Sequence, residues 1–119
     1  MAFPAMATAQ KPASVSLTTI HVADLAPGPS GAVYWGKEIS EQEAVKRRKA
    51  GLDIVVRGND NGANNQIAKK IETHVGLWIP HFPHISRGQK ALPHIQQISG
   101  TPRGHSFYEV NLRKAVKKP

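Results

Sequence analysis

The stretch that decides the fold runs from Trp78 to Asn111 and reads WIPHFPHISRGQKALPHIQQISGTPRGHSFYEVN. Prolines and glycines divide it into short segments with β-branched and aromatic residues, a pattern that is typical of strands between turns. We therefore expect strands near Leu77–Phe82, Pro93–Ile98 and His105–Val110. These strands would supply most of the sheet.

Upstream of this stretch, strand-like and helix-like segments alternate. Val15 to Val22 is rich in β-branched residues and predicts a strand. Ser40 followed by Glu43 matches a capping box, which predicts a helix that Gly51 would end. Asp53–Arg57 predicts a short strand covered on both faces, because its centre is continuously apolar. Apolar residues at four-residue spacing predict a second helix over about residues 63–75.

The last turn of the first helix contains four consecutive cations, Lys46 to Lys49. Cations at this end of a helix complement its dipole while their side chains stay in water. The other interpretation is that they contact phosphate groups.

The 119 residues are enough for one domain with one modest core. We predict a single α+β domain over residues 15–119, with two helices packed on a small, mostly antiparallel sheet, compact and ribonuclease-like. Residues 1–14, rich in Ala, Pro, Thr and Ser, predict a flexible N-terminal tail. The chain has no cysteine, so packing alone must stabilise it.

The charge balance favours a polyanionic partner. Lys and Arg total 16 against 8 acidic residues, which gives a net charge of +8. Such a surface suits nucleic acid or an anionic membrane, although a merely soluble basic surface is the alternative. No apolar run approaches the ~20 residues of a membrane-spanning helix, so we expect no membrane span.

Four of the six histidines lie in the Trp78–Asn111 stretch, with Glu109 as its one carboxylate. Imidazole can give or take a proton near neutral pH, and Lys or Arg can stabilise a phosphate that gains charge. These residue types predict RNA cleavage without metal, in which one group removes the 2′-hydroxyl proton and another protonates the leaving oxygen. We expect no cofactor. The residues expected to bind nucleic acid are Arg87, Arg103, His81 and His84.

Alternation along the last strand separates its side chains into two sets. His105, Phe107 and Glu109 would share one face, and Tyr108 the other. If Phe107 is in the core, His105 lies beside it and Tyr108 is the more exposed. Glu109 is a candidate base, or a residue that orients a histidine. The competing interpretation makes His105 a buried, hydrogen-bonded core residue.

Metal sites are the competing chemistry. The four imidazoles of the stretch include the pair His81 and His84, which could bind zinc. However, residues three apart in an extended segment tend to point to opposite faces. A magnesium site needs carboxylates, and Asp53 and Asp60 would have to join from elsewhere in the chain.

Four patterns, AGLDIVVRG, AN followed by IAKKIE, KALPHIQ and GHSFYE, together resemble the C-terminal toxin domains of bacterial polymorphic toxins. These domains are the variable tips of Rhs-type and contact-dependent inhibition proteins. The resemblance covers roughly residues 40 to 116, and its most specific pieces are residues 91–94 and 104–109. Such domains are often nucleases of a compact α+β ribonuclease type, each paired with a cognate immunity protein.

The resemblance implies an endoribonuclease-type toxin that acts on RNA. It implies delivery by a bacterial secretion system as part of a larger protein, action in the target-cell cytoplasm, and an acidic immunity protein as partner. We expect a monomer. A non-catalytic nucleic-acid-binding module, or a toxin that hydrolyses nucleotides or transfers ADP-ribose, stays open. The candidate catalytic residues are His94, His105, Tyr108 and Lys90.

Overall fold

The computed structural model describes residues 18–82 and 90–119. Our expectations for the tail at residues 1–14, and for His84 and Arg87, lie outside the described residues. The elements in chain order are β1 (Thr19–Leu25), β2 (Val33–Ile39), α2 (Glu41–Lys49), β3 (Ile54–Arg57), α3 (Asn61–Thr73), β4 (Trp78–His81), β5 (His94–Gln97), β6 (Ser106–Tyr108) and β7 (Val116–Lys117).

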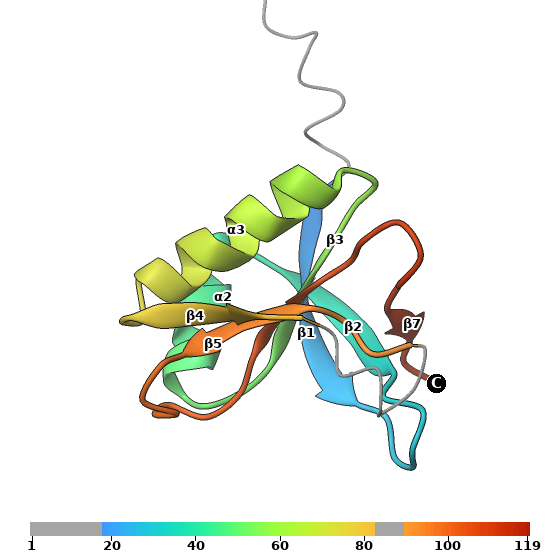
Figure 1. Cartoon of the computed structure of the whole chain (residues 1–119), viewed down its shortest axis with the longest axis horizontal. Helices are drawn as coiled ribbons and strands as arrows, with labels where there is room; N and C mark the ends of the chain where they lie inside the picture. The colour runs from blue at the N-terminus through green and yellow to red at the C-terminus, as the bar shows by residue number, and fades with distance from the viewer. Residues whose placement is uncertain (1–17, 83–89) are drawn as a thin grey trace, which may run out of the picture.

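The strands form one sheet in the order β4-β5-β6-β3-β1-β2-β7 (Figure 1). β3 pairs in parallel with β6, and β2 with β7, while the other neighbouring strands are antiparallel. The α+β class that the sequence predicts is therefore confirmed. The sheet is larger than the small one expected and is mixed. It is also not built largely from the C-terminal half, because β1, β2 and β3 supply its middle and one side.

Helix α2 begins as the sequence predicts. Ser40 is its N-cap, and the Glu43 backbone N–H donates to the Ser40 hydroxyl across 3.1 Å. In return the Ser40 N–H donates to the Glu43 carboxylate across 3.0 Å, which completes the capping box. Gly51 follows the helix with a φ of 81°, a left-handed conformation that glycine adopts without steric cost. Helix α3 starts earlier than expected, because Asp60 caps it by accepting from the Ala63 N–H across 3.0 Å.

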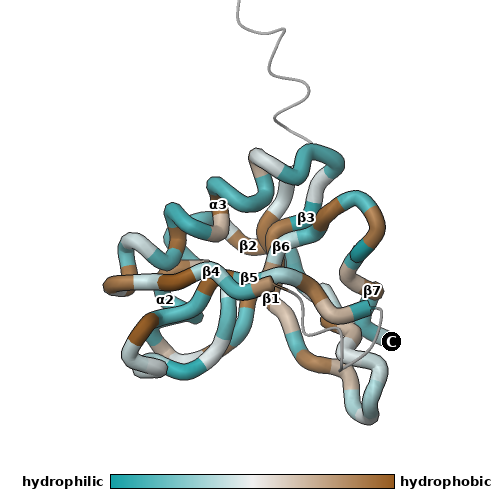
Figure 2. The backbone as a smooth tube through the Cα atoms, in the orientation of Figure 1, coloured by the Kyte–Doolittle hydropathy of each residue, from teal (hydrophilic) through white to brown (hydrophobic). Residues whose placement is uncertain are grey.

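The sheet separates two hydrophobic clusters, and β3 contributes to both. Ile54 and Val56 pack with residues of α2 and α3 on one face, while Val55 packs on the other. All three are fully buried, which confirms the prediction of a strand covered on both faces. Figure 2 shows α3 with many hydrophilic residues, interrupted by a few apolar ones. Of these, Ala68 and Ile71 lie in the cluster beneath the helix. The face opposite the helices is covered by Leu92 and Ala115, among others.

Within residues 18–82 and 90–119, no helix has both the length and the apolar character needed to cross a bilayer.

Candidate active site

Three histidines lie side by side across neighbouring strands, and we call His81, His94 and His105 the imidazole row. The β4–β5 register places His81 opposite His94, and their rings stack with centroids 5.2 Å apart. The ring of His105, just before β6, meets the ring of His94 edge-on at 4.7 Å. The antiparallel pairing of β5 with β6 explains this second contact, because it sets His94 opposite Phe107, two residues after His105.

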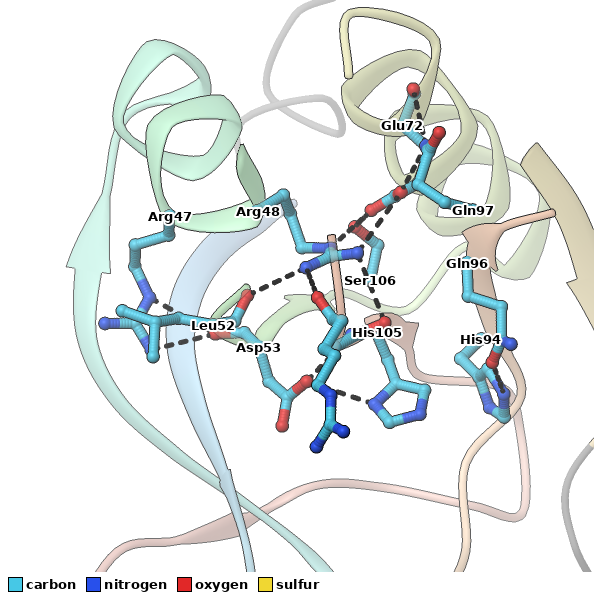
Figure 3. A network of polar contacts seen from close by, with 12 residues as sticks. Arg47, Arg48, Leu52, Asp53, Glu72, His94, Gln96, Gln97, His105 and Ser106 are labelled. Atoms are coloured by element: carbon cyan, nitrogen blue, oxygen red, sulfur yellow. Dashed lines mark hydrogen bonds and ion pairs between the residues drawn. The ribbon is translucent and has the colours of Figure 1, made fainter. Parts of the chain in front are cut away.

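His94 is the buried member of the row. It is 2% exposed, and its ring also packs against Phe107 with centroids 5.5 Å apart. Its Nε2 lies 3.1 Å from the side-chain carbonyl oxygen of Gln96 (Figure 3). His94 therefore packs between His81, His105 and Phe107 and is almost completely shielded from solvent.

His105 is the accessible member, with its side chain 31% exposed. Its Nδ1 lies 3.0 Å from Oδ1 of Asp53, and its backbone N–H donates to the same oxygen across 2.7 Å. Because a carboxylate oxygen can only accept, Nδ1 carries a proton, and Nε2 is the acceptor atom of the neutral ring. The arrangement is a histidine whose tautomer and orientation are set by an aspartate.

The parallel pairing of β3 with β6 brings these two residues together. Ile54 is in register with Ser106, so the residues that precede them, Asp53 and His105, lie next to each other. Gly104 makes the close approach possible. Its φ is 96°, and a Cβ there would lie 3.1 Å from Oδ1 of Asp53.

Sequence reasoning did not place Asp53 in the site. The available signal was that Asp53 and His105 each stand directly before a short apolar strand. That signal becomes useful only once the two strands are known to pair in parallel.

A pocket of about 520 Å³ opens beside the row, within the size range of small-molecule sites. It lies between the turn that joins β1 to β2 and the segment that leads into β5. Its walls are mostly apolar, and two imidazoles stand at one side. The lining residues are Leu25, Ala26, Gly28, Pro29, Gly31, Ala91, Leu92, His94, His105 and Phe107.

The other candidate residues are not gathered at this pocket. Tyr108 follows Phe107 on β6 and so points to the opposite face, where it packs against the helix-side core. Lys90 is exposed and directly precedes Ala91 of the pocket wall. Arg103 is exposed and lies two residues before His105.

The sequence suggested Glu109 as a base or as a residue that orients a histidine, but its carboxylate binds other groups. Its carboxylate accepts from Nε of Arg57 across 3.1 Å and from the backbone N–H groups of Gly58 and Ala115. It is 2% exposed. Glu109 thus ties the C-terminal segment to the end of β3, and Asp53 is the carboxylate that orients a histidine.

Across the described residues, no group of three or more histidine, aspartate or glutamate side chains is arranged to hold a metal ion. His84 lies outside that part of the chain, so the pairing of His81 with His84 is not covered by this finding.

No protein-family model matches the chain, and comparisons with curated proteins and with solved structures find no match either.

Proposed function

We propose that this domain is a metal-independent ribonuclease whose acid–base centre is the His105–Asp53 pair. The observation that supports the proposal most is the position of His105. It lines a pocket large enough for a nucleotide base, and Asp53 binds its Nδ1, so Nε2 is the nitrogen proposed to accept the proton. A ribonuclease needs such a group within reach of the 2′-hydroxyl.

The chemistry would run in one proton-coupled displacement. Nε2 of His105 takes the proton of the 2′-hydroxyl, and that oxygen attacks the adjacent phosphorus. The bond from phosphorus to the 5′ oxygen breaks, leaving a cyclic phosphate, and the departing oxygen takes up a proton. We assign that second transfer to His94, which lines the same pocket. In this step His94 starts as the imidazolium and becomes neutral when it gives its proton to the 5′ oxygen.

The charge of the chain supports an RNA substrate. A net charge of +8 attracts a polyanion and makes the interaction weaken as salt rises. The exposed Lys90 and Arg103 are proposed to contact the phosphates on either side of the pocket. The same role is proposed for Arg87 and His84 on the basis of the sequence alone. His81, the half-buried end of the row, is proposed to contact a base or phosphate.

The resemblance to polymorphic toxins supports a biological setting, which we also propose. The domain would be delivered as the tip of a larger secreted protein and would act in the cytoplasm of a competitor. An acidic immunity protein would cover the imidazole row and the pocket mouth, and salt would slow its association. Salt-independent binding, or protection of α2 alone, would argue against this partner.

Incubating the purified chain with total RNA, with and without EDTA, tests the activity. We expect cleavage that EDTA does not reduce and that His105→Ala lowers by about 10²–10⁴-fold. His74→Ala is the matched control, because His74 is exposed at the end of α3, away from the pocket lining. It should cleave normally.

Either of two other results would favour a different function. RNA that binds in a salt-dependent way but stays intact would indicate a non-catalytic nucleic-acid-binding module. Consumption of free nucleotides or of NAD without RNA cleavage would indicate a different toxin activity.

A further inference from the structure

Arg48, in the last turn of α2, is a fully buried cation. Its side chain is 0% exposed, and so is that of Glu72 on α3, which it meets at 2.6 Å between Nε and Oε2. The expectation that these cations stay in water does not hold for Arg48, and its full burial keeps it from reaching a phosphate. A buried ion pair of this kind is costly to form, since both charges leave water.

The rest of the guanidinium binds backbone carbonyls. Nη1 donates to the carbonyl oxygens of Leu52 and Arg103, across 3.2 and 2.7 Å. Nη2 donates to the carbonyl oxygen of Gly104 across 3.2 Å. Figure 3 shows Arg48 between the Glu72 carboxylate on one side and the Asp53 and His105 segments on the other.

These carbonyls have a specific relation to the proposed acid–base pair. A peptide unit is planar, so the carbonyl of Leu52 lies in one plane with the nitrogen of Asp53. The carbonyl of Gly104 likewise lies in one plane with the nitrogen of His105. By holding both carbonyls, one guanidinium sets the orientation of the two peptide units from which the pair projects.

Neighbouring contacts hold the same two segments. Arg47 donates to the carbonyl oxygen of Asp53 from Nε and Nη2, across 3.2 and 3.0 Å. Ser106, the residue after His105, donates its hydroxyl to Oε2 of Glu72 across 2.6 Å. Gln97 donates to Oε1 of Glu72 across 2.8 Å, so the counter-charge of Arg48 is itself fixed.

We propose that Arg48 is a positioning residue that aligns Asp53 with His105. Two apolar side chains would fill the same space at no charge-burial cost, so packing alone does not explain a buried arginine here. The planar guanidinium, with five N–H donors, can bind Glu72 and three carbonyls at once, whereas a lysine ammonium has three donors on one atom. The catalytic consequence rests on the proposed ribonuclease function, but the alignment itself does not.

The test compares Arg48→Lys with Ile71→Val. Arg48→Lys keeps the charge opposite Glu72 but loses the simultaneous hold on the carbonyls. Ile71→Val loosens the core between α3 and the sheet but leaves Arg48 and Glu72 in place. The primary readout is the NMR signal of the Nδ1 proton of His105, which reports its hydrogen bond to Asp53. The second readout is the separation of kcat from KM for RNA cleavage.

We expect Arg48→Lys to shift the Nδ1 proton signal and to speed its exchange with water. Its kcat should fall by about 10²-fold, as a small misplacement of an acid–base group can cause, while KM changes little. Ile71→Val should keep the signal and most of kcat. If Arg48→Lys does not fold, the double variant Arg48→Met, Glu72→Met replaces it. That variant removes both charges with little change in volume, and it should fold with the signal displaced.

A folded Arg48→Lys, or a folded double variant, with an unchanged His105 signal would overturn the positioning role. An equal displacement in Ile71→Val would also overturn it, because general loosening of the core would then suffice. If the signals move as expected but the wild-type chain cleaves no RNA, the positioning role stands and the ribonuclease proposal fails.

Discussion

His105 and Asp53 are 52 positions apart in the chain, yet Nδ1 of the imidazole lies 3.0 Å from Oδ1 of the carboxylate. The aspartate precedes β3 and the histidine precedes β6, so the parallel register of these two strands creates the contact. The carboxylate also accepts the backbone N–H of His105, which restrains ring and backbone together.

Asp53→Asn should leave the fold intact and lower RNA cleavage by about 10²-fold or more. Both contacts of Asp53 with His105 use Oδ1, so an asparagine can keep them through its carbonyl oxygen. It loses the negative charge that stabilises the imidazolium formed when Nε2 takes up the proton. Steady-state kinetics on a short RNA, with circular dichroism to check the fold, measures the effect.

Asp60→Asn is the control, because it makes the same chemical change at the N-cap of α3, where asparagine caps equally well. Equal activity of the two variants would exclude Asp53 from the proposed chemistry.

His94→Ala should destabilise the domain by about 3 kcal/mol, since it removes a buried ring from between His81, His105 and Phe107. His94→Phe keeps most of that volume and should recover much of the loss. Urea denaturation gives both free energies of unfolding.

The activity of folded His94→Phe separates the two roles of His94. Loss of cleavage supports its proposed proton transfer. Wild-type cleavage by this variant would show that His94 serves packing only.

Removing one partner of the buried ion pair should strongly destabilise the domain. Glu72→Ala leaves the charge of Arg48 unopposed in the core and should lower the free energy of unfolding by about 3–5 kcal/mol. Chemical denaturation at neutral pH measures the loss.

Glu41→Ala provides the comparison, because Glu41 pairs with Lys70 at 3.3 Å on the surface, where both side chains are solvated. Its expected cost is about 0–1 kcal/mol. Similar losses in the two variants would mean that burial does not set the strength of the Arg48–Glu72 interaction.

The folding stability of the domain should depend on pH through Glu43. The backbone N–H of Ser40 donates to this carboxylate and lowers the pKa of Glu43, and the Ser40 hydroxyl adds to the effect. A lowered folded pKa means that the charged form stabilises α2. This stabilisation is complete above the pKa of Glu43 in the unfolded chain, and it is lost as pH falls through the folded pKa.

The difference in melting temperature between the wild type and Glu43→Ala should therefore be largest at neutral pH and shrink in acid. Thermal scans at several pH values measure it. Glu38→Ala, an exposed residue on β2, is the reference for general acid effects. A difference that grows in acid would contradict the capping-box account.

Local sequence patterns predicted several elements of the fold. The capping box at Ser40 and the apolar run of β3 are short-range signals, and the structure has both elements where they indicate. The C-terminal strands also appear, although each is shorter than expected: β6, for example, covers Ser106–Tyr108 rather than His105–Val110. Strand pairing was not accessible, because the sequence does not state which distant segments lie side by side. The expectation of a sheet drawn mainly from the C-terminal half was wrong because the seven-residue strand β2 was not predicted.

The candidate site, too, could be predicted only in part from the sequence. Alternation on β6 correctly grouped His105 with Phe107, whose rings are 4.9 Å apart, and set Tyr108 on the other face. The same argument offered Glu109 as the carboxylate near histidine, since it was the one acid in the stretch. Asp53 takes that place because it comes from a strand that pairs in parallel with β6. Arg48 could not be distinguished from its neighbours in a run of cations, because only packing against α3 shows which one is buried.

The junction between β3 and β6 has a consequence for the order of assembly. Strands β1, β2 and β3 lie on one side of it with β7, and β4, β5 and β6 lie on the other. Hairpin contacts such as β1 with β2 close short loops, whereas β3 with β6 must close a loop of nearly half the chain, which is slow. Asp53 precedes β3, which pairs with β1, whereas His105 belongs to the segment that follows it in the chain. In a chain still being synthesised, Asp53 therefore emerges before His105, and the pair forms only when β3 and β6 join.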